Sequence, residues 1–384
     1  MGRRCARQAA GQWLDMDCRI DFSSVDALLR EAVAEGVIPG AGVCIRTADS
    51  VLHTASFGQQ ELKPVLTPAT NQTVWDVASL TKVLATTPIA MGMVADGSLD
   101  LHTPVSRLFP DAPEGVTAAH LLSHSSGLGP WLPMAELVGI EGAGTDAARE
   151  AVLSLARTSQ VHAEPGEAYA YSDLGFLTLC SLLEELGQTR LDGLYERYVR
   201  SPSGVDLRFG WPGAAATEDC PQRQRVIKGE VHDLNAWIMG GVSSHAGLFG
   251  SVESVAAAAA WQFRAWLGAS SEGLSPAVAQ VFFETKGAGS HRLGWDGVSE
   301  GGSAGPLWPR DGVGHLAFTG CSIWMAPKLD LVVALCTNRL HPEIEGGAVP
   351  DAPIHPRYAA FRKLRPALYT AVIEAMGERT GWPD

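Results

Sequence analysis

Runs of residues that favour β-strands lie at the two opposite ends of this chain. Near the N-terminus, AGVCIR and VLHTASF flank the short connection TADS within residues 41–57. Near the C-terminus, the runs 321–326 and 331–336 are joined by a proline-led turn at residues 327–330. Two such runs joined by so short a turn predict a β-hairpin. We therefore expect one sheet that is assembled from both ends of the chain.

Helical patterns fill the space between these two hairpins. Apolar residues recur at helical spacing in residues 25–33, 80–95, 147–156, 174–186 and 255–266. A closing helix at about residues 358–376 carries enough apolar side chains to cover one face of the sheet. The middle of the chain is therefore predicted to be mainly helical.

The chain shows no internal repeat and no clear linker between separate domains. Residues 1–19 have little periodicity and are expected to form an N-terminal arm. We expect one domain over residues 20–378. Within it, an α/β lobe is predicted at about residues 20–75 and 285–378, and a helical lobe at about residues 76–284.

The composition excludes several classes of protein. Hydrophobic residues make up 46% of the chain and charged residues 18%, which indicates a folded globule. A formal net charge of -13 and the absence of a basic patch argue against binding to nucleic acid or to anionic lipid surfaces. No uninterrupted apolar stretch approaches the roughly eighteen residues that a membrane span needs. We expect no membrane span.

The cysteines and the N-terminus bear on location. The seven cysteines are scattered without a CxxC pair, which predicts reduced thiols and no metal cluster. Arg3 and Arg4 open the chain, but Gln8, Gln12 and Asp15 interrupt what would be the apolar core of a signal peptide. We expect a cytoplasmic protein, unless translation starts at a different codon.

The most informative segment is WDVASLTK, at residues 75–82. Ser79 and Lys82 lie one helical turn apart, so their side chains share a face and can touch. A lysine amine can take the proton of a serine nucleophile only if burial or positive charge lowers the pKa of that lysine. A helix beginning at Ser79 would also point N–H groups at a developing oxyanion. The plainer interpretation is an N-cap serine beside a solvated lysine.

The second segment, PGEAYAYSDLGF at residues 165–176, is a loop that runs into a helix. Ser172 or Asp173 can cap that helix, and capping is the plain interpretation of both. Tyr171 lies where the loop could present its phenol as a proton shuttle beside a lysine. Tyr169 is predicted to be a packed aromatic residue.

With both segments in view, the chain resembles the serine β-lactamase and penicillin-binding superfamily, particularly the class C-like branch with its esterases and D-stereospecific peptidases. The Ser-x-x-Lys motif of that family matches Ser79 and Lys82. Its Tyr-x-Asn motif matches Tyr171 and Asp173, with aspartate where class C enzymes carry asparagine. If ionised, the extra carboxylate would favour a protonated Lys82.

Further stretches extend the resemblance to residues 20–378. HLLSHSSGL, EVHDLNA and GGVSSHAGLF match scaffold signatures of the branch in the expected order. The implied fold class is α/β, of the β-lactamase/transpeptidase type. It has a mainly antiparallel sheet flanked by helices, beside a mainly helical second lobe.

The third active-site element of this family is a strand that carries Lys-Thr-Gly or a variant. The matching residues are His315, Leu316 and Ala317, and the N–H groups of Ser79 and Phe318 would then form the oxyanion hole. A register three residues later would start the triplet at Phe318 instead, and would make Cys321 the N–H donor. We prefer the first register.

The resemblance thus nominates catalytic, oxyanion-hole and substrate-binding residues, which are Ser79, Lys82, Tyr171, Asp173, His315, Leu316, Ala317 and Phe318. In penicillin-recognising members, the strand lysine and threonine help to hold the substrate carboxylate. His315 and Leu316 offer at best one titratable donor there. We therefore expect β-lactam hydrolysis to be weak or absent, and an ester, amide or peptide substrate to be accommodated more easily.

Other polar residues near these motifs are predicted to be structural. A metal site or a Ser-His-Asp relay could be suggested by His232, Asp233 and Asn235. No matched carboxylate or histidine lies at the spacing of metal ligands, so we predict no zinc site. His120, His124 and His245 lie in the scaffold stretches, where turn hydrogen bonds or a place on the pocket rim are expected. We predict no cofactor.

The resemblance implies a serine hydrolase that forms a covalent acyl-enzyme with a small-molecule or peptide substrate. The variant third motif leaves open a second hypothesis, a penicillin-binding or sensor protein that is acylated without turnover. A third hypothesis is an acyltransferase that delivers the acyl group to an alcohol. The sequence does not determine the substrate or the oligomeric state.

Overall fold

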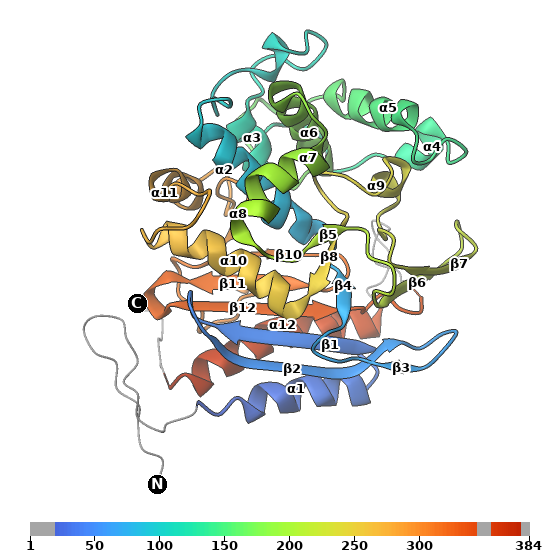
Figure 1. The fold of residues 1–384 in the computed structure, drawn as a ribbon, viewed down its shortest axis with the longest axis vertical. Coiled ribbons are helices and arrows are strands. Elements are labelled where there is room, and N and C mark those ends of the chain that lie inside the picture. Colours follow the sequence, from blue (N-terminus) through green and yellow to red (C-terminus); the bar gives the residue numbers. More distant parts are fainter. Residues whose placement is uncertain (1–19, 344–354, 378–384) are drawn as a thin grey trace.

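The computed structural model describes residues 20–343 and 355–377, and the arm predicted over residues 1–19 lies outside them. At its centre is a seven-stranded antiparallel sheet with the order β3-β2-β1-β12-β11-β10-β9. Both predicted hairpins are present, as β1 with β2 and β11 with β12. β1 pairs with β12, with Ala41 opposite Thr337. The two ends of the chain therefore build one sheet, as predicted (Figure 1).

The strands of this sheet are β1 (Gly40–Arg46), β2 (Val51–Glu61), β3 (Thr67–Pro68), β9 (Asp296–Gly297), β10 (Val313–Leu316), β11 (Ser322–Ala326) and β12 (Leu331–Thr337). Two smaller sheets contain β4 (Val74–Asp76), β5 (Arg208–Phe209) and β8 (Leu248–Ser251), and β6 (Ala216–Cys220) with β7 (Arg225–Lys228).

The longer helices are α1 (Ser23–Ala34), α2 (Thr87–Ala95), α5 (Asp146–Arg157), α6 (Asp173–Gly187), α10 (Val252–Trp266), α11 (Pro276–Glu284) and α12 (Pro356–Ala375). The short ones are α3 (Ala118–Leu122), α4 (Met134–Val138), α7 (Leu191–Tyr195), α8 (Ser201–Ser203) and α9 (Leu234–Ile238). The remaining turns are 3₁₀ turns η1 (Ala78–Leu80), η3 (Val105–Arg107) and η5 (Pro327–Leu329), and π-helical turns η2 (Lys82–Thr86) and η4 (Glu196–Arg200).

Helices cover both faces of the main sheet. Successive residues of a strand point to opposite faces, so a strand with apolar residues throughout needs a covering layer on each side. In β1, Val43 and Ile45 belong to a core shared with α1 and α12, whereas Cys44 belongs to the core on the other face. On that second face, α10 packs against β1 and β12 (Figure 1). Gly42 permits this approach, since a Cβ there would lie 3.1 Å from Val252.

The position of α10 differs from the predicted division into lobes. Its residues fall within 76–284, which we assigned to the helical lobe, yet the helix lies on the sheet. Eleven of its fifteen residues are buried. A helix that is buried on nearly all sides belongs to a protein interior. It lies between the sheet and the helical region in Figure 1.

The segment that carries Ser79 departs from a regular α-helix. It starts with η1, continues as the π-turn η2 and becomes the α-helix α2 only at Thr87. Ala78 has a φ of +42°, which is unusual for a residue with a side chain. The buried carboxylate of Asp76 accepts the N–H of Ala78 at 2.8 Å and holds this turn. The helix predicted over residues 80–95 is thus present with an irregular first part.

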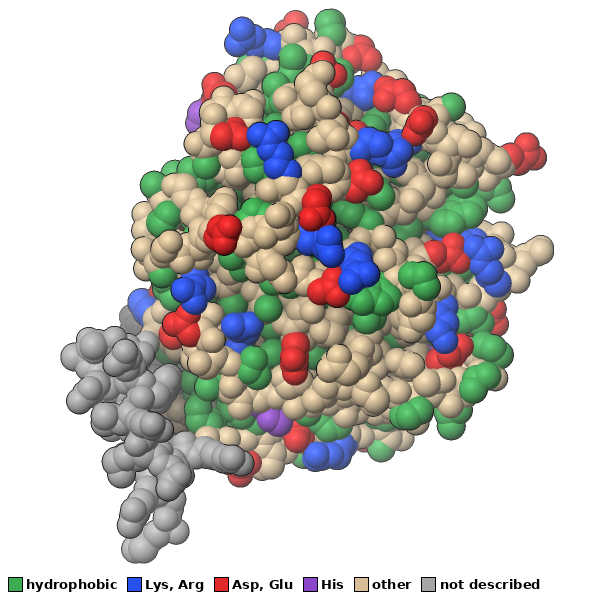
Figure 2. Space-filling model, in the orientation of Figure 1, with side chains coloured by type: hydrophobic (Ala, Val, Ile, Leu, Met, Phe, Trp, Pro, Cys, Tyr) green, Lys and Arg blue, Asp and Glu red, His purple; other side chains and the backbone are tan. Residues whose placement is uncertain are grey.

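One stretch among the described residues, Ala78–Ala95, is apolar and long enough to cross a membrane, but 83% of it is buried inside the protein. It also contains Lys82, so it is not uninterrupted. Such burial is typical of a core helix in a folded domain. On the face shown in Figure 2, lysine and arginine side chains are scattered among acidic ones.

Candidate active site

The structure brings Ser79 and Lys82 into contact. Lys82 Nζ lies 3.2 Å from Ser79 Oγ, as the spacing of the two residues predicts. The Lys82 side chain is completely buried, and its ammonium lies over the rings of Tyr171 and Phe176, at 4.9 and 5.5 Å from their centroids. The interpretation of Lys82 as a solvated surface lysine is therefore wrong.

Asp173 forms an ion pair with this lysine. Its Oδ1 lies 2.7 Å from Lys82 Nζ. Burial acts to lower the pKa of Lys82, but the Asp173 carboxylate and the Tyr171 phenol outweigh it, so the pKa lies above its ordinary value. Lys82 is an ammonium in the resting protein. The aspartate thus keeps the lysine protonated, as we expected for an ionised carboxylate at this position.

At the start of α6, one residue caps the helix and the next contacts Lys82. Of the two possible caps, Ser172 is the N-cap, because its hydroxyl accepts the N–H of Gly175 at 2.9 Å. Asp173 is the first residue of the helix and turns toward Lys82. Burial raises the pKa of the Tyr171 phenol, although Lys82 acts to lower it. Tyr171 is therefore a neutral donor beside the lysine.

The strand β10 brings the third element to the same cavity. Residues 315–318 all line it, together with Ser79, Tyr171 and Asp173. The N–H of Phe318 donates no hydrogen bond to a described residue, whereas that of Ala317 donates to the carbonyl of Cys321. Cys321, the donor in the alternative register, is fully buried and does not line this cavity. The geometry therefore favours the register that starts at His315.

The cavity has a volume of about 1520 Å³. Trp131, Val138 and Ile140, at and around α4, form an apolar lip on one side. Phe318 stands at the cavity with 41% of its surface exposed, which is unusual for a large apolar residue. The arrangement can hold an apolar group next to the contact between Ser79 and Lys82.

A family model described as Beta-lactamase matches residues 25–351. The chain belongs to the beta-lactamase family. A protein of Salmonella agona (strain SL483) named "Putative D-alanyl-D-alanine carboxypeptidase" is 26% identical over 349 residues, which cover 81% of this chain and 78% of that protein. A protein of Salmonella typhi with the same name is 26% identical over 344 residues, covering 80% and 77%.

Solved structures share the fold of this beta-lactamase family member. EstCE1, "a hydrolase with promiscuous acyltransferase activity", has a TM-score of 0.69 at 22% identity, covering 91% of this chain and 98% of that chain. The octameric penicillin-binding protein homologue from Pyrococcus abyssi also has a TM-score of 0.69 at 22% identity, covering 94% and 78%. The α/β fold class, the resemblance and the assignment as a serine hydrolase are confirmed. The roles of individual residues stay predictions.

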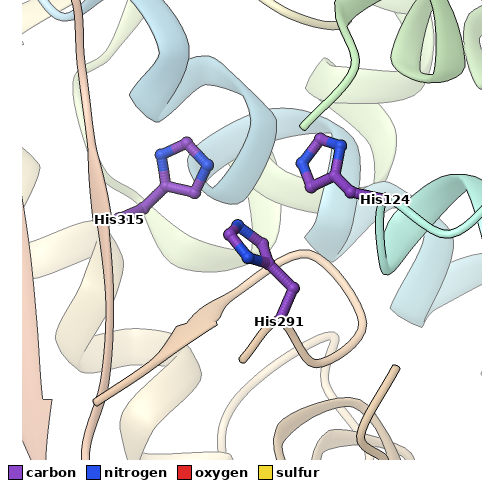
Figure 3. Close-up of side chains that lie close together, drawn as sticks. All are labelled: His124, His291 and His315. Carbon is purple, nitrogen blue, oxygen red and sulfur yellow. The ribbon is translucent and has the colours of Figure 1, made fainter. Parts of the chain in front are cut away.

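One part of the site was missed by the sequence analysis. His291 comes from the glycine-rich loop before β9 and lies beside His124 and His315, with one ring nitrogen of each within 4.8 Å of those of the others (Figure 3). Burial and the neighbouring His291 and Lys82 hold the pKa of His124 well below its ordinary value. Burial followed by Lys82 does the same to the pKa of His315. The rings are neutral.

These three histidines do not fit a metal ion as they lie. Nδ1 of His124 accepts the N–H of Ser172 at 3.0 Å, so the neutral ring carries its proton on Nε2. Neither nitrogen of His124 then has a free lone pair for a metal. The ammonium of Lys82 adds positive charge close by. No pattern in the sequence links residues 124, 291 and 315, because only the folded chain brings them together.

The other polar residues singled out in the sequence form structural contacts. Asp233 caps α9 by accepting the N–H of Ala236 at 2.7 Å, and it also pairs with His245 Nε2 at 3.0 Å. His232 pairs with Glu218 at 2.6 Å. The amide of Asn235 donates to the carbonyl of Leu132, although the residue also lines the cavity. Tyr169 is not fully packed: it stacks on His291 at the cavity and is 40% exposed.

Proposed function

We propose that the protein hydrolyses an ester, amide or peptide bond through a covalent acyl-enzyme on Ser79. The contact of Ser79 Oγ with the buried Lys82 Nζ, at 3.2 Å inside the large cavity, carries this proposal. The N–H groups of Ser79 and Phe318 would stabilise the oxyanion that forms when Ser79 attacks a carbonyl carbon. Membership of the beta-lactamase family supports the same chemistry.

Because Lys82 is already protonated, it can accept the Ser79 proton only by passing one of its own to a neighbour. The Asp173 carboxylate at 2.7 Å is the acceptor. As the bond from Ser79 Oγ to the carbonyl carbon forms, the Ser79 proton moves to Lys82 and a Lys82 proton moves to Asp173. The Tyr171 phenol then protonates the leaving group and regains its proton from Asp173 through Lys82. Water releases the acyl group by the reverse sequence.

We propose the type of bond that reacts, an ester, amide or peptide bond, and not a particular substrate molecule. The named Salmonella relatives favour a peptide, and the apolar lip at Trp131 and Ile140 favours an apolar substituent. His315 is neutral and Leu316 is apolar, so this strand supplies no cation for the carboxylate of a β-lactam. We accordingly propose weak or absent β-lactamase activity.

Acyl transfer to an alcohol is the second candidate. The cavity volume of about 1520 Å³ exceeds the roughly 300–1,000 Å³ of an ordinary small-molecule site, which leaves room for both an acyl group and an acceptor. A rise in transfer product with alcohol concentration, at constant total turnover, would establish this activity. A product ratio that does not depend on alcohol concentration would exclude it.

The first experiment is intact mass spectrometry after incubation with a fluorophosphonate and, separately, with a penicillin. We expect a fluorophosphonate adduct in the wild type and none in Ser79→Ala, together with turnover of a chromogenic ester that falls at least about a hundredfold in the variant. A penicillin adduct without turnover of any ester would favour the sensor hypothesis. Full ester hydrolysis by Ser79→Ala would refute the assignment of the nucleophile.

We also propose that the protein works in a reducing, cytoplasmic compartment. Five cysteines among the described residues are buried and free, which are Cys44, Cys180, Cys220, Cys321 and Cys336. Buried free thiols are common in reducing compartments. Detection of the native protein in a periplasmic or secreted fraction would refute this location.

A further inference from the structure

Three arginines line the active-site cavity: Arg223 pairs with Glu230 at 3.8 Å, whereas Arg339 and Arg365 form no ion pair with an acid among the described residues. Arg339 follows β12, and its guanidinium lies 5.2 Å from the ring of Phe318 and 4.9 Å from that of Tyr358. Arg365, on α12, is only 8% exposed, and its Nε and Nη1 have no hydrogen-bond partner. Both guanidinium groups lie near the ring of Phe361, at 5.3 and 4.9 Å.

Within residues 20–343 and 355–377, no carboxylate pairs with either of these two groups. Burial lowers the pKa of Arg339 to about 10, and burial also lowers that of Arg365. The neighbours that act most to raise these pKa values are phenols and a thiol, among them Tyr358 and Tyr369, and none of them is a carboxylate. The two arginines also repel each other. This end of the cavity is therefore a desolvated site with two positive charges.

Other buried arginines in the chain have acidic partners. Arg149 pairs with Glu184 at 2.5 Å, and Arg157 pairs with Glu150 at 2.7 Å. A buried charge without a partner costs stability, and one in a cavity wall can be compensated by a ligand of opposite charge. Arg339 and Arg365 fit that second case, because they line the same cavity as Ser79 and, unlike Arg223, have no acidic partner among the described residues.

The position of the pair indicates which part of a substrate reaches it. Tyr171, the proposed donor to the leaving group, lies on the side of the three histidines. Arg339 instead lies over the ring of Phe318, the residue whose N–H is proposed for the oxyanion hole. A substrate whose leaving group departs toward Tyr171 would extend its acyl part past Phe318 toward Arg339.

We propose that Arg339 and Arg365 bind a carboxylate carried by the acyl part of the substrate, so that this hydrolase prefers monoesters or monoamides of dicarboxylic acids. This inference rests on the proposed function. A guanidinium presents parallel N–H donors that match the two oxygens of a carboxylate. Arg339 and Arg365 would thus supply the anion recognition that the strand residues His315 and Leu316 do not.

Binding can be measured without turnover. Monomethyl glutarate is titrated calorimetrically into the Ser79→Ala protein, with methyl pentanoate as the matched uncharged ligand. We expect the glutarate monoester to bind at least tenfold more tightly than the pentanoate. Adding Arg365→Gln or Arg339→Gln should remove that preference, whereas Arg362→Gln, an exposed arginine of the same helix, should keep it. Equal binding of the two ligands would overturn the inference.

Turnover provides the second readout. For the wild type, we expect a kcat/KM for p-nitrophenyl hydrogen glutarate at least tenfold above that for p-nitrophenyl pentanoate. The arginine variants should lose this ratio through a higher KM for the glutarate ester, whereas Arg362→Gln should keep both the ratio and the wild-type rate on the pentanoate. Equal losses on both esters would show a structural role and overturn the inference. If neither ester is hydrolysed but the glutarate preference in binding persists, the proposed hydrolysis fails and the carboxylate site stands.

Where Arg365→Gln does not fold, Arg339→Gln carries the test, since the side chain of Arg339 is only partly buried. Arg365→Lys gives a further check. It retains the charge but loses the paired donors, so its preference for the glutarate ester should fall between those of the wild type and Arg365→Gln.

Discussion

A single carboxylate sets the protonation state at the centre of this site. Without Asp173, burial would drive Lys82 toward its neutral form, which is the form that can act as a base. With Asp173 at 2.7 Å, the lysine stays protonated, so in the proposed mechanism it acts as a relay and not as the base. In that mechanism, aspartate in place of the family's asparagine moves the proton acceptor one residue further from Ser79.

Replacing this carboxylate should change the pH dependence of catalysis. In Asp173→Asn, the pKa of Lys82 falls because the largest contribution that opposes burial is removed, and Lys82 itself must lose a proton before it can accept one. We expect kcat/KM at pH 6 to drop by about tenfold or more, within the range of general-base effects, and to recover toward pH 9. A pH–rate profile for a chromogenic ester measures this. Asp173→Glu should keep the wild-type shape, and an unchanged profile in Asp173→Asn would contradict the relay.

The contact between Ser79 and Lys82 could be predicted from the spacing of the two residues in the sequence. Ser79 and Lys82 are three positions apart, so local geometry alone brings their side chains together. Their contact with Asp173 was reached through family resemblance. His291 and Arg365 carry no local pattern, since one lies in a loop and the other on a helix at the far end of the chain. Only tertiary packing places them at the cavity.

At the level of elements, one buried acid ties the nucleophile turn to its neighbours. The Asp76 carboxylate accepts N–H groups from Ala78 at 2.8 Å and from His232 at 2.7 Å. Its backbone carbonyl accepts the hydroxyl of Thr319, which follows β10, at 2.9 Å. The end of β4 thus links the turn with Ser79 to the segment that holds Phe318.

Asp76→Asn should weaken both folding and catalysis. The amide retains one acceptor oxygen, so at least one of the two N–H groups is left facing another donor in a buried place. We expect a loss of about 1–3 kcal/mol in the free energy of unfolding, measured in urea. We also expect kcat to fall about tenfold because the Ser79 turn loses its anchor.

A cap on a remote helix provides the control for Asp76→Asn. Thr145 accepts the N–H of Ala148 at the start of α5, so Thr145→Ala should cost about 1 kcal/mol of stability without changing kcat. If both variants lower kcat equally, the effect of Asp76→Asn is one of general stability.

The regular elements were predictable, whereas the irregular ones were not. Both hairpins follow from β-rich runs joined by short turns, and the main helices follow from helical spacing, which are local patterns of the sequence. The π-turn η2 depends on long-range contacts, such as the Thr86 hydroxyl that donates to the carbonyl of Ser244 at 2.7 Å. The place of α10 on the sheet likewise depends on a glycine in β1 rather than on the pattern of α10 itself.

Across the whole molecule, the cavity gathers titratable groups from distant parts of the chain. The three histidines come from the loop after α3, the loop before β9 and the strand β10. Each has a pKa below its ordinary value, with burial as the main cause. The fold therefore places three neutral imidazoles next to the ammonium of Lys82, and we expect the free energy of unfolding to depend on pH.

The sign of that dependence follows from proton uptake. Above about pH 6.5 the histidines are neutral in both the folded and the unfolded chain. As the pH falls below this value, the unfolded chain binds protons that the folded chain does not, so the free energy of unfolding falls by up to about 1.4 kcal/mol per pH unit for each histidine. His124→Asn keeps an acceptor for the N–H of Ser172 but removes one titrating group. Urea unfolding between pH 7.5 and 5.5 should therefore show a shallower loss of stability in this variant than in the wild type. Identical slopes would mean that His124 takes up a proton in the folded protein.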